Sequence, residues 1–366
     1  MKAKKRVVTA GPQTPTRRTP TVRRVKSAIV PAVRRSPVPG VRATQATGPA
    51  GPATAGGIGK GDPDRAAGPS VDLAVDLGRG LVLANPLVAA SGPFGFGVEV
   101  ADSVDLGRLG AIVTRGTTMR ARAGAPPPRM TATASGIVHN LGFQNPGVDA
   151  VIAKHEPTWG SWSVPVVVNV CGEAAGEFVE VVRRLEGLAG VAAVELNLGC
   201  PNAARGGTPF TVDPDAAAFL VGAVRRTWDR CLIAKLSPGA SDIRSVARAV
   251  VSAGADALSA IGGVAALAVG GPGAGAVLTG PAIHPVAVRV VSEVAGAVGV
   301  PVVAYGGVAS VDDVLDFLAV GAVAVGVGTA ALADPSLPVR LAGELEEVVA
   351  ARGLASYRDL VRTGRR

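Results

Sequence analysis

One short segment of the 366-residue chain combines a thiol with two primary amides. Cys200 lies between Asn197 and Asn202 in the run Asn-Leu-Gly-Cys-Pro-Asn, directly after an apolar stretch. Two amides on a short loop are poor core formers but can bind a polar planar ring. A thiol beside them can act as a base once its surroundings lower its pKa. We therefore interpret Cys200 as a functional residue; the alternative is a structural cysteine.

The other two cysteines, Cys171 and Cys231, adjoin apolar runs, and we expect both to be inert buried thiols. Three cysteines in a chain of this length do not make a disulfide framework, and their spacing matches no zinc site. The sequence therefore predicts no metal centre and favours a reducing, cytoplasmic environment. The first residues, Met-Lys-Ala-Lys-Lys-Arg, are not followed by the apolar segment of a secretory signal.

A single cation closes another apolar run. Lys235 follows Leu-Ile-Ala at the end of a predicted buried strand. One interpretation is a lysine whose ammonium reaches solvent along an apolar stem. We favour a fixed positive charge beneath a bound ring on which negative charge develops during the reaction.

Two glycine sites occur late in the chain, at Gly306-Gly307 and at Gly328-Thr329. Glycine lets the backbone approach an anion closely, and the Thr329 hydroxyl adds a donor. Either site alone could be an ordinary turn. Because they follow two successive predicted strands, we interpret them together as a phosphate cradle.

The elements that position these residues repeat along the chain. Short apolar runs alternate with longer helical patterns at intervals of roughly 25–45 residues, which is typical of buried parallel strands with crossover helices. The eight predicted strands are Leu87–Ala90, Ile112–Thr114, Val166–Val170, Ala193–Asn197, Leu232–Lys235, Ala257–Ile261, Val302–Ala304 and Ala324–Val327. Predicted helices include 176–188, 214–226, 243–253, 285–298 and 311–319, with helix-start signals at Asp213 and Ser310. We predict a TIM (β/α)8 barrel, with a doubly wound open sheet as the structural alternative.

Charge and composition divide the chain at about residue 70. Residues 1–70 hold 14 of the 37 Lys and Arg residues but only two of the 28 acidic ones, and the remainder has a net charge of −3. Residues 1–70 are rich in Pro, Arg and Ala without hydrophobic periodicity, so we predict a disordered N-terminal extension followed by one domain over 71–366. The extension is either an electrostatic tether to an acidic partner or nucleic acid, or it is inert, as translated sequence upstream of the true start would also be. The predicted domain has no basic surface of the kind that binds nucleic acid. Its apolar stretches are broken by glycine and too short to cross a membrane.

Six further segments are informative together: Ala90–Gly97, Thr133–Gly136, Leu141–Gly147, Glu195–Asn202, Lys235–Pro238 and Gly280–Ile283. They resemble the class 1 dihydroorotate dehydrogenases, most closely the 1B branch, and the match runs in the family's order from about Val71 to Val348. The resemblance implies an FMN-dependent oxidoreductase that converts dihydroorotate to orotate in pyrimidine biosynthesis. It also implies a homodimeric core and a partner subunit that carries an iron–sulfur cluster and FAD.

The resemblance assigns roles to individual residues. Cys200 is implied as the catalytic base, which takes a proton from the ring carbon beside the carbonyl while hydride leaves the neighbouring carbon for the flavin. The implied FMN-binding residues are Ser91, Gly116, Asn169, Asn197, Lys235, Ile261, Gly280, Gly306, Gly307, Gly328 and Thr329. The implied substrate-binding residues are Arg115, His139, Asn140, Leu141, Gly142, Phe143, Asn197 and Asn202.

Three substrate-holding positions depart from the family's pattern. Arg115 replaces a lysine, His139 replaces an asparagine that has moved to Asn140, and Gly262-Gly263 replaces an Asn-Thr pair. A missing partner for a buried polar group costs about 1–3 kcal/mol, and such losses change specificity strongly. Two alternatives therefore accompany the leading hypothesis. One is the same flavin chemistry on another dihydropyrimidine or cyclic amide, and the other is a non-catalytic FMN-binding protein.

Overall fold

The computed structural model describes residues 71–361. The predicted disordered extension over residues 1–70, and with it the predicted tether to nucleic acid, lies outside the described residues, as do residues 362–366. The statements below concern residues 71–361.

Eight parallel strands close into a barrel in the order β11-β12-β15-β16-β3-β4-β7-β8. Nearly every residue in these strands is buried because helices cover the outside and side chains fill the inside. Closure excludes the open sheet and confirms the predicted TIM barrel. The strands are β3 (Leu87–Ala89), β4 (Ala111–Val113), β7 (Val166–Val170), β8 (Ala193–Asn197), β11 (Cys231–Leu236), β12 (Ala257–Ala260), β15 (Val302–Tyr305) and β16 (Ala324–Val327).

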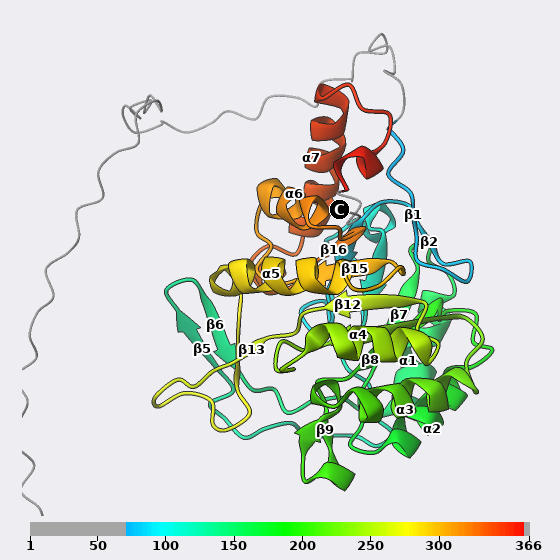
Figure 1. The fold of residues 1–366 in the computed structure, drawn as a ribbon, viewed down its shortest axis with the longest axis vertical. Helices are drawn as coiled ribbons and strands as arrows, with labels where there is room; N and C mark the ends of the chain where they lie inside the picture. The colour runs from blue at the N-terminus through cyan, green and yellow to red at the C-terminus, as the bar shows by residue number, and fades with distance from the viewer. Residues whose placement is uncertain (1–70, 362–366) are drawn as a thin grey trace, which may run out of the picture. The chain divides into compact units, whose positions relative to one another are not determined.

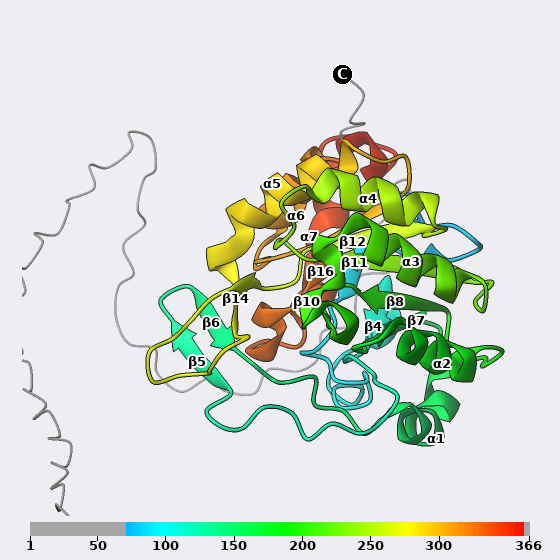
Figure 2. The same cartoon turned by 60° about the horizontal axis from the view of Figure 1, so that its bottom comes forward.

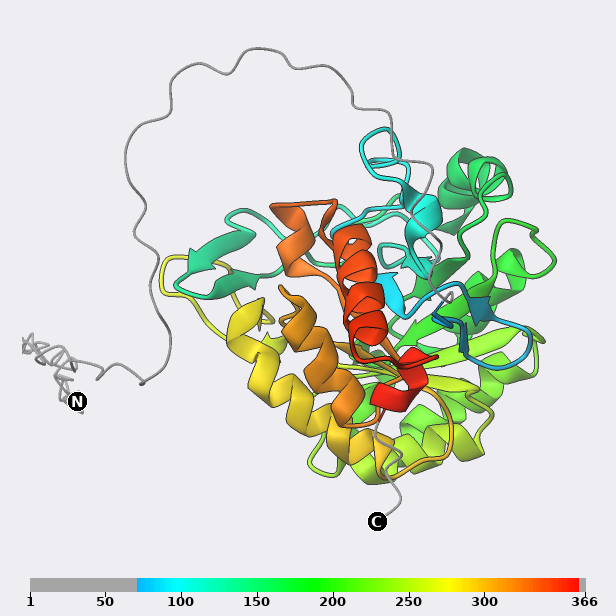
Figure 3. The same ribbon diagram turned by 90° about the horizontal axis from the view of Figure 1, so that it is seen from above.

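Helices cover the outer surface of the barrel, and α5, α6 and α7 lie side by side along one part of it (Figures 1 and 3). Their bounds are α1 (Val148–Trp159), α2 (Ala175–Leu185), α3 (Pro214–Arg225), α4 (Ile243–Ser252), α5 (His284–Ala295), α6 (Val311–Ala319) and α7 (Leu337–Ala351). Between β3 and β4 the short 3₁₀ turn η1 (Leu106–Arg108) stands where a crossover helix would be expected. The predicted start signals are confirmed: Asp213 accepts from the first turn of α3, and Ser310 forms a capping box with Asp313 on α6.

A small antiparallel sheet extends beyond the barrel and was not predicted. Its order is β13-β14-β6-β5, so two distant parts of the chain pair through β6 and β14. Figures 1 and 2 show this sheet to one side of the barrel strands. The strands are β5 (Met130–Thr133), β6 (Gly136–His139), β13 (Val264–Ala265) and β14 (Val277–Thr279). They are short and partly exposed, so they lack the apolar runs that mark the barrel strands.

Two short hairpins complete the described elements. β1 (Val75–Asp76) pairs with β2 (Val82–Leu83), and β9 (Pro201–Asn202) pairs with β10 (Thr208–Pro209) directly after Cys200. Further 3₁₀ turns are η2 (Ala203–Arg205), η3 (Phe210–Val212), η4 (Pro281–Ile283), η5 (Thr329–Leu332) and η6 (Tyr357–Leu360). Within residues 71–361, no helix combines the length and the apolar character that a membrane span requires.

Candidate active site

Lys235 lies in a buried polar cluster inside the barrel, where the prediction placed it. Its Nζ is 3.3 Å from Glu195 Oε1 and donates to Ser91 Oγ at 2.9 Å. The ammonium also lies 4.5 Å from the centre of the Tyr305 ring. The side chain of Lys235 is only 10% exposed and that of Glu195 is fully buried, so the pair is shielded from solvent. Ser91, after β3, and Lys235, on β11, are therefore brought together by barrel closure.

Glu195 organises the interior side of this cluster. Its Oε1 accepts from Asn169 Nδ2 at 2.6 Å, and its Oε2 accepts from Ser259 Oγ at 2.6 Å. Burial, followed by the nearby Glu195 carboxylate, raises the pKa of Tyr305 well above its usual range. The carboxylate thus fixes one FMN-binding candidate, Asn169, and balances the charge of another, Lys235.

The Asn169 and Asn197 amides meet the Cys171 thiol at the ends of β7 and β8, where Cys200 lines the same cleft. Asn197 Oδ1 accepts from the backbone N–H of Gly199, and Asn197 Nδ2 lies 3.6 Å from Cys171 Sγ. Cys171 Sγ donates to Asn169 Oδ1 at 3.3 Å. A hydrogen bond with Cys200, followed by burial, raises the pKa of Cys171 well above its usual range. Cys171 is buried, as expected, and it lies among the candidate site residues.

Cys231 is the cysteine that lies elsewhere. It is fully buried at the start of β11 and contacts the carbonyl oxygen of Leu77 at 3.5 Å. Burial is the largest cause that raises its pKa, to about 12. Cys231 begins β11, and Lys235 lies near the other end of that strand. Because active-site residues in such barrels gather at the ends of the strands, Cys231 lies away from the candidate site.

The late glycine sites converge with Gly280. A Cβ placed on Gly307 would lie 2.9 Å from the carbonyl oxygen of Gly280, and one placed on Gly280 would lie 3.5 Å from Thr329 Cγ2. Gly306 and Gly307 adopt φ values of +135° and +78°, which favour glycine. Among residues 71–361, no backbone acceptor takes the N–H of Gly306, Gly307 or Gly328. These glycines present donors of the kind that bind phosphate.

Gly116 and Ile261 complete the set of predicted cofactor residues. A Cβ on Gly116 would lie 2.7 Å from Cys171 Sγ and 3.2 Å from Asn169 Oδ1, so only glycine fits beside these groups. Ile261 follows β12 and donates its N–H to Tyr305 O at 3.0 Å. Both positions therefore border the cluster around Glu195 and Lys235.

Two of the predicted substrate-binding residues, Asn140 and Asn202, use their side chains in hydrogen bonds within the chain. Asn140 bonds Ala274 O and the N–H of Gly142, so its amide holds the loop that contains Leu141 and Phe143. The Asn202 oxygen accepts from Ala204 N, which leaves its NH₂ group as the available donor. These contacts give Asn140 and Asn202 local structural roles as well.

Arg115 and His139, two further predicted substrate-binding residues, have side chains with fewer partners in the described part of the chain. Arg115 is half-buried after β4, and within the described residues no carboxylate pairs with it. His139 ends β6 with Nδ1 buried and without a partner in the described residues, and burial lowers its pKa. A Cβ added to Gly262 would meet nothing within 4 Å, so the space of the missing side chain is open.

A narrow cleft opens on the thiols. The space within it has no room for a water-sized molecule, so as it stands it is too narrow for a substrate ring or a flavin nucleotide. It is lined by Thr118, Arg122, Phe143, Cys171, Gly172, Glu173, Cys200 and Pro201. The cofactor assignment therefore rests on the donors around the barrel mouth and not on this volume.

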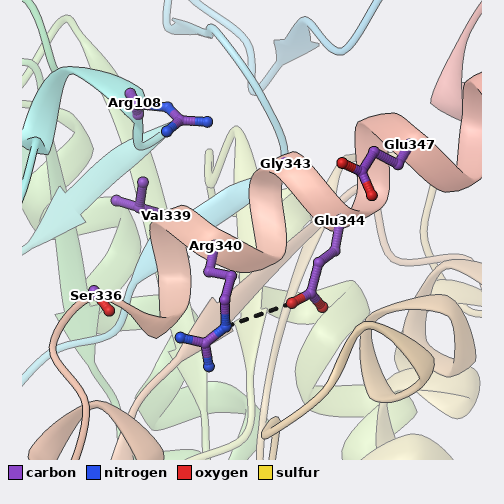
Figure 4. A pocket seen from close by; sticks show the side chains of 7 residues that line it. All are labelled: Arg108, Ser336, Val339, Arg340, Gly343, Glu344 and Glu347. Carbon is purple, nitrogen blue, oxygen red and sulfur yellow. Dashed lines mark ion pairs between the residues drawn. The ribbon is translucent and has the colours of Figure 1, made fainter. Parts of the chain in front are cut away.

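A second, more open hollow of about 340 Å³ lies against α7 (Figure 4). Arg340 there pairs with Glu344 at 3.4 Å, and Arg108 and Glu347 line the same hollow. None of the predicted site residues lines it.

Three residues of the cluster were given no role by the sequence. Glu195 and Asn197 are two residues apart in an apolar strand, so their side chains share its inner face. This spacing was the signal in the sequence that could have identified Glu195 as a site residue. Cys171 directly follows β7, and this position just past a strand could have marked it as a site residue. Tyr305 ends β15 and gave no signal of its own, because aromatic residues are also ordinary core.

The dihydroorotate dehydrogenase family model matches residues 74–349, which include every candidate residue described above. The chain belongs to this family. The catalytic subunit of dihydroorotate dehydrogenase B (NAD(+)) from Geotalea daltonii is 41% identical over 303 residues, covering 79% of this chain and 97% of that protein. The protein of the same name from Desulforudis audaxviator is 42% identical, covering 77% of this chain and 94% of its own length.

The resemblance to the 1B branch of the dihydroorotate dehydrogenase family is therefore confirmed. A solved structure of DHODH from Eimeria tenella in complex with ferulenol superposes with a TM-score of 0.68 at 19% identity. The alignment covers 82% of this chain and 90% of that chain, and at this identity it supports the fold alone.

Proposed function

We propose that this chain is an FMN-dependent dihydroorotate dehydrogenase, which oxidises dihydroorotate to orotate for pyrimidine biosynthesis in the cytoplasm. The observation that carries the proposal is that the turn holding the Cys200 thiol begins at Asn197, on the strand next to the Lys235 ammonium, where Cys200 N donates to Asn197 O. Asn197 and Lys235 are direct partners in the register of β8 and β11. A thiol base and a fixed cation beside one ring fit this reaction.

The residues present fit FMN. Lys235 and Ser91 would meet the polar edge of the ring, Asn169 and Asn197 would add amide contacts, and the glycine cradle would take the phosphate. When bound, FMN supplies a two-electron acceptor. Glu195 keeps Lys235 in place and holds Asn169 oriented through a 2.6 Å hydrogen bond.

Cys200 would remove the proton from the substrate carbon beside the carbonyl group. The short turn after β8 holds this thiol, because Cys200 N donates to Asn197 O at 3.1 Å. The NH₂ groups of Asn197 and Asn202 would orient the pyrimidine ring. The Arg115 guanidinium, which pairs with no carboxylate among residues 71–361, would bind the substrate carboxylate, for which its forked donors are suited.

The relatives are named as catalytic subunits, which supports a partner subunit for this chain as well. We propose a homodimeric core that passes electrons to a separate subunit with an iron–sulfur cluster and FAD. Co-expression of such a subunit should give a complex that reduces NAD⁺ with dihydroorotate. Failure to form a complex would remove this part of the proposal.

A second candidate function is supported by the open space at Gly262. Where the family has an amide side chain, this chain has none, so a substrate with a different ring substituent would fit. This candidate keeps the flavin chemistry and changes the substrate to another dihydropyrimidine or cyclic amide.

One experiment separates the two candidates. The full-length chain is loaded with FMN, freed of oxygen, and mixed in separate samples with dihydroorotate or with dihydrouracil, which lacks the carboxylate. Loss of the yellow colour with dihydroorotate alone is expected. Bleaching by dihydrouracil alone would support the second candidate, and a chain that takes up no FMN would contradict both. Arg115→Gln should weaken reduction by dihydroorotate more than binding of FMN.

A further inference from the structure

We infer that Cys171 and Cys200 are a redox-active thiol pair, which a hydroperoxide converts reversibly to a disulfide. Only the expected loss of activity on oxidation rests on the proposed function, in which Cys200 is the catalytic base. Formation of the disulfide itself depends on the position of two thiols and not on any substrate.

The two thiols are placed together by neighbouring strands. Cys171 directly follows β7, and Cys200 lies in the turn that follows β8. The last register pair of β7 and β8 is Val170 with Leu196, and the turn after β8 keeps Cys200 near this strand end, because Cys200 N donates to Asn197 O at 3.1 Å. A disulfide needs Cα atoms about 4.4–6.8 Å apart, a span within reach of the ends of two adjacent strands. Both side chains line the same cleft, and Cys200 is the largest influence that raises the pKa of the Cys171 thiol.

The surroundings give the two sulfur atoms different parts in the reaction. Cys171 lies between Asn169 and Asn197 and stays protonated, because its hydrogen bond with Cys200 and its burial both oppose ionisation. Cys200 must reach the thiolate form to act as a base, and thiolates are the form that hydroperoxides attack. A thiol beside it then resolves the oxidised sulfur.

The chemistry balances with a hydroperoxide as the oxidant. The Cys200 thiolate attacks the outer peroxide oxygen, the O–O bond breaks, and the protonated alcohol or water leaves; Cys200 becomes a sulfenic acid. The Cys171 sulfur then attacks the Cys200 sulfur, and the hydroxide takes the Cys171 proton and leaves as water. Two thiols are oxidised to one disulfide while one peroxide is reduced by two electrons. The base is lost until a thiol reductant restores it.

The chain allows a direct chemical readout. Trypsin cuts at Lys154, Arg183, Arg184 and Arg205, so Cys171 falls in peptide 155–183 and Cys200 in peptide 185–205. Cys231 falls in a third peptide, 231–235. The FMN-loaded full-length chain is treated with hydrogen peroxide, then unfolded in guanidinium chloride, alkylated with iodoacetamide and digested without reduction. We expect peptides 155–183 and 185–205 to be joined and peptide 231–235 to be alkylated.

Separate oxidation of Cys200 without the joined peptides would overturn the inference, and so would a link that involves Cys231. These outcomes are independent of catalysis. If the joined peptides form but dihydroorotate does not reduce the flavin, the proposed function fails and the thiol pair stands. If the flavin is reduced but the peptides remain separate, the thiol pair fails alone.

Matched variants test the resolving role of Cys171. After peroxide treatment, the wild-type chain and Cys231→Ala should regain with dithiothreitol the activity each had before. Cys171→Ala should not regain its own starting activity, because an unresolved sulfenic acid oxidises further to the sulfinic acid. Equal recovery in Cys171→Ala would contradict the inference. Cys171→Ser, which keeps the volume but cannot form a disulfide, should behave as Cys171→Ala does.

Discussion

Glu195 is the residue on which the arrangement of the site depends most. A buried carboxylate that bonds Lys235, Asn169 and Ser259 sets the positions of groups from three other strands. Removing one member of such a pair leaves a buried charge without its partner, which costs more than the pair itself contributes.

Glu195→Gln should therefore lower the free energy of unfolding by about 3–5 kcal/mol, because the Lys235 ammonium remains buried without a counter-charge. The double variant Glu195→Gln/Lys235→Met should recover part of this loss, since it leaves no unpaired charge. Urea unfolding of the flavin-free protein measures both, without a contribution from bound cofactor. Equal stability of the single and double variants would contradict the proposed pairing.

His139 gives a prediction about pH. Burial lowers its pKa in the folded state, so below about pH 6.5 the unfolded chain binds a proton that the folded chain does not. Stability from this group is therefore present at neutral pH and is lost as the pH falls through that window. Between about pH 7.5 and about pH 5.5, wild type should lose more unfolding free energy than His139→Asn. Equal losses would show that burial does not shift this histidine.

Some site residues could be predicted from the sequence because their positions follow from a single strand. Lys235 ends an apolar run, so its side chain had to point into the barrel or reach solvent. Glu195 gains its role only through Lys235, Ser259 and Asn169, which lie 26 to 64 residues away in the chain. Contacts of this kind arise from closure of the barrel and leave no local pattern.

At the scale of elements, the barrel strands were predictable because burial on both faces gives continuous apolar runs. The sheet formed by β5, β6, β13 and β14 was not, because its short strands are stabilised by pairing between residues 130–139 and 264–279. That sheet carries His139 and ends beside Gly280, so an unpredicted element positions two predicted site residues.

Packing between β15 and β16 links the barrel interior to the site. A Cβ on Gly326 would lie 1.9 Å from Cε1 of Tyr305, whose ring contacts Lys235. Gly326→Ala should therefore displace the ring and lower the unfolding free energy by about 1–3 kcal/mol. Gly299→Ala is the matched control, because a Cβ there meets nothing within 4 Å. Thermal or urea unfolding measures both; a Gly326→Ala variant as stable as its control would contradict the packing described.

At the scale of the whole molecule, the first described residues close the domain against its last ones. Asp72 N donates to Ala355 O at 2.9 Å, and Asp72 Oδ2 lies 3.2 Å from Arg358 Nη1. The family match also begins at residue 74. Residues 71–361 therefore contain the pairings that the barrel needs.

A chain that begins at residue 71 should fold, bind FMN in the same ratio as the full chain and be reduced by dihydroorotate at the same rate. The flavin spectrum and anaerobic reduction of both forms check this. The 14 basic residues within 1–70 should matter only for polyanions, so DNA or RNA binding should fall on truncation and depend on salt. Equal nucleic-acid binding by the two forms would remove a role for residues 1–70.

The central claim is that the Cys200 thiol acts on a substrate held against the flavin. Its most direct test is the rate at which dihydroorotate bleaches the flavin in the absence of oxygen, compared between Cys200→Ala, Cys231→Ala and wild type. Loss of a general base should slow bleaching in Cys200→Ala by about 10²–10⁴-fold, while Cys231→Ala keeps the wild-type rate. Bleaching of Cys200→Ala at the wild-type rate would contradict the account.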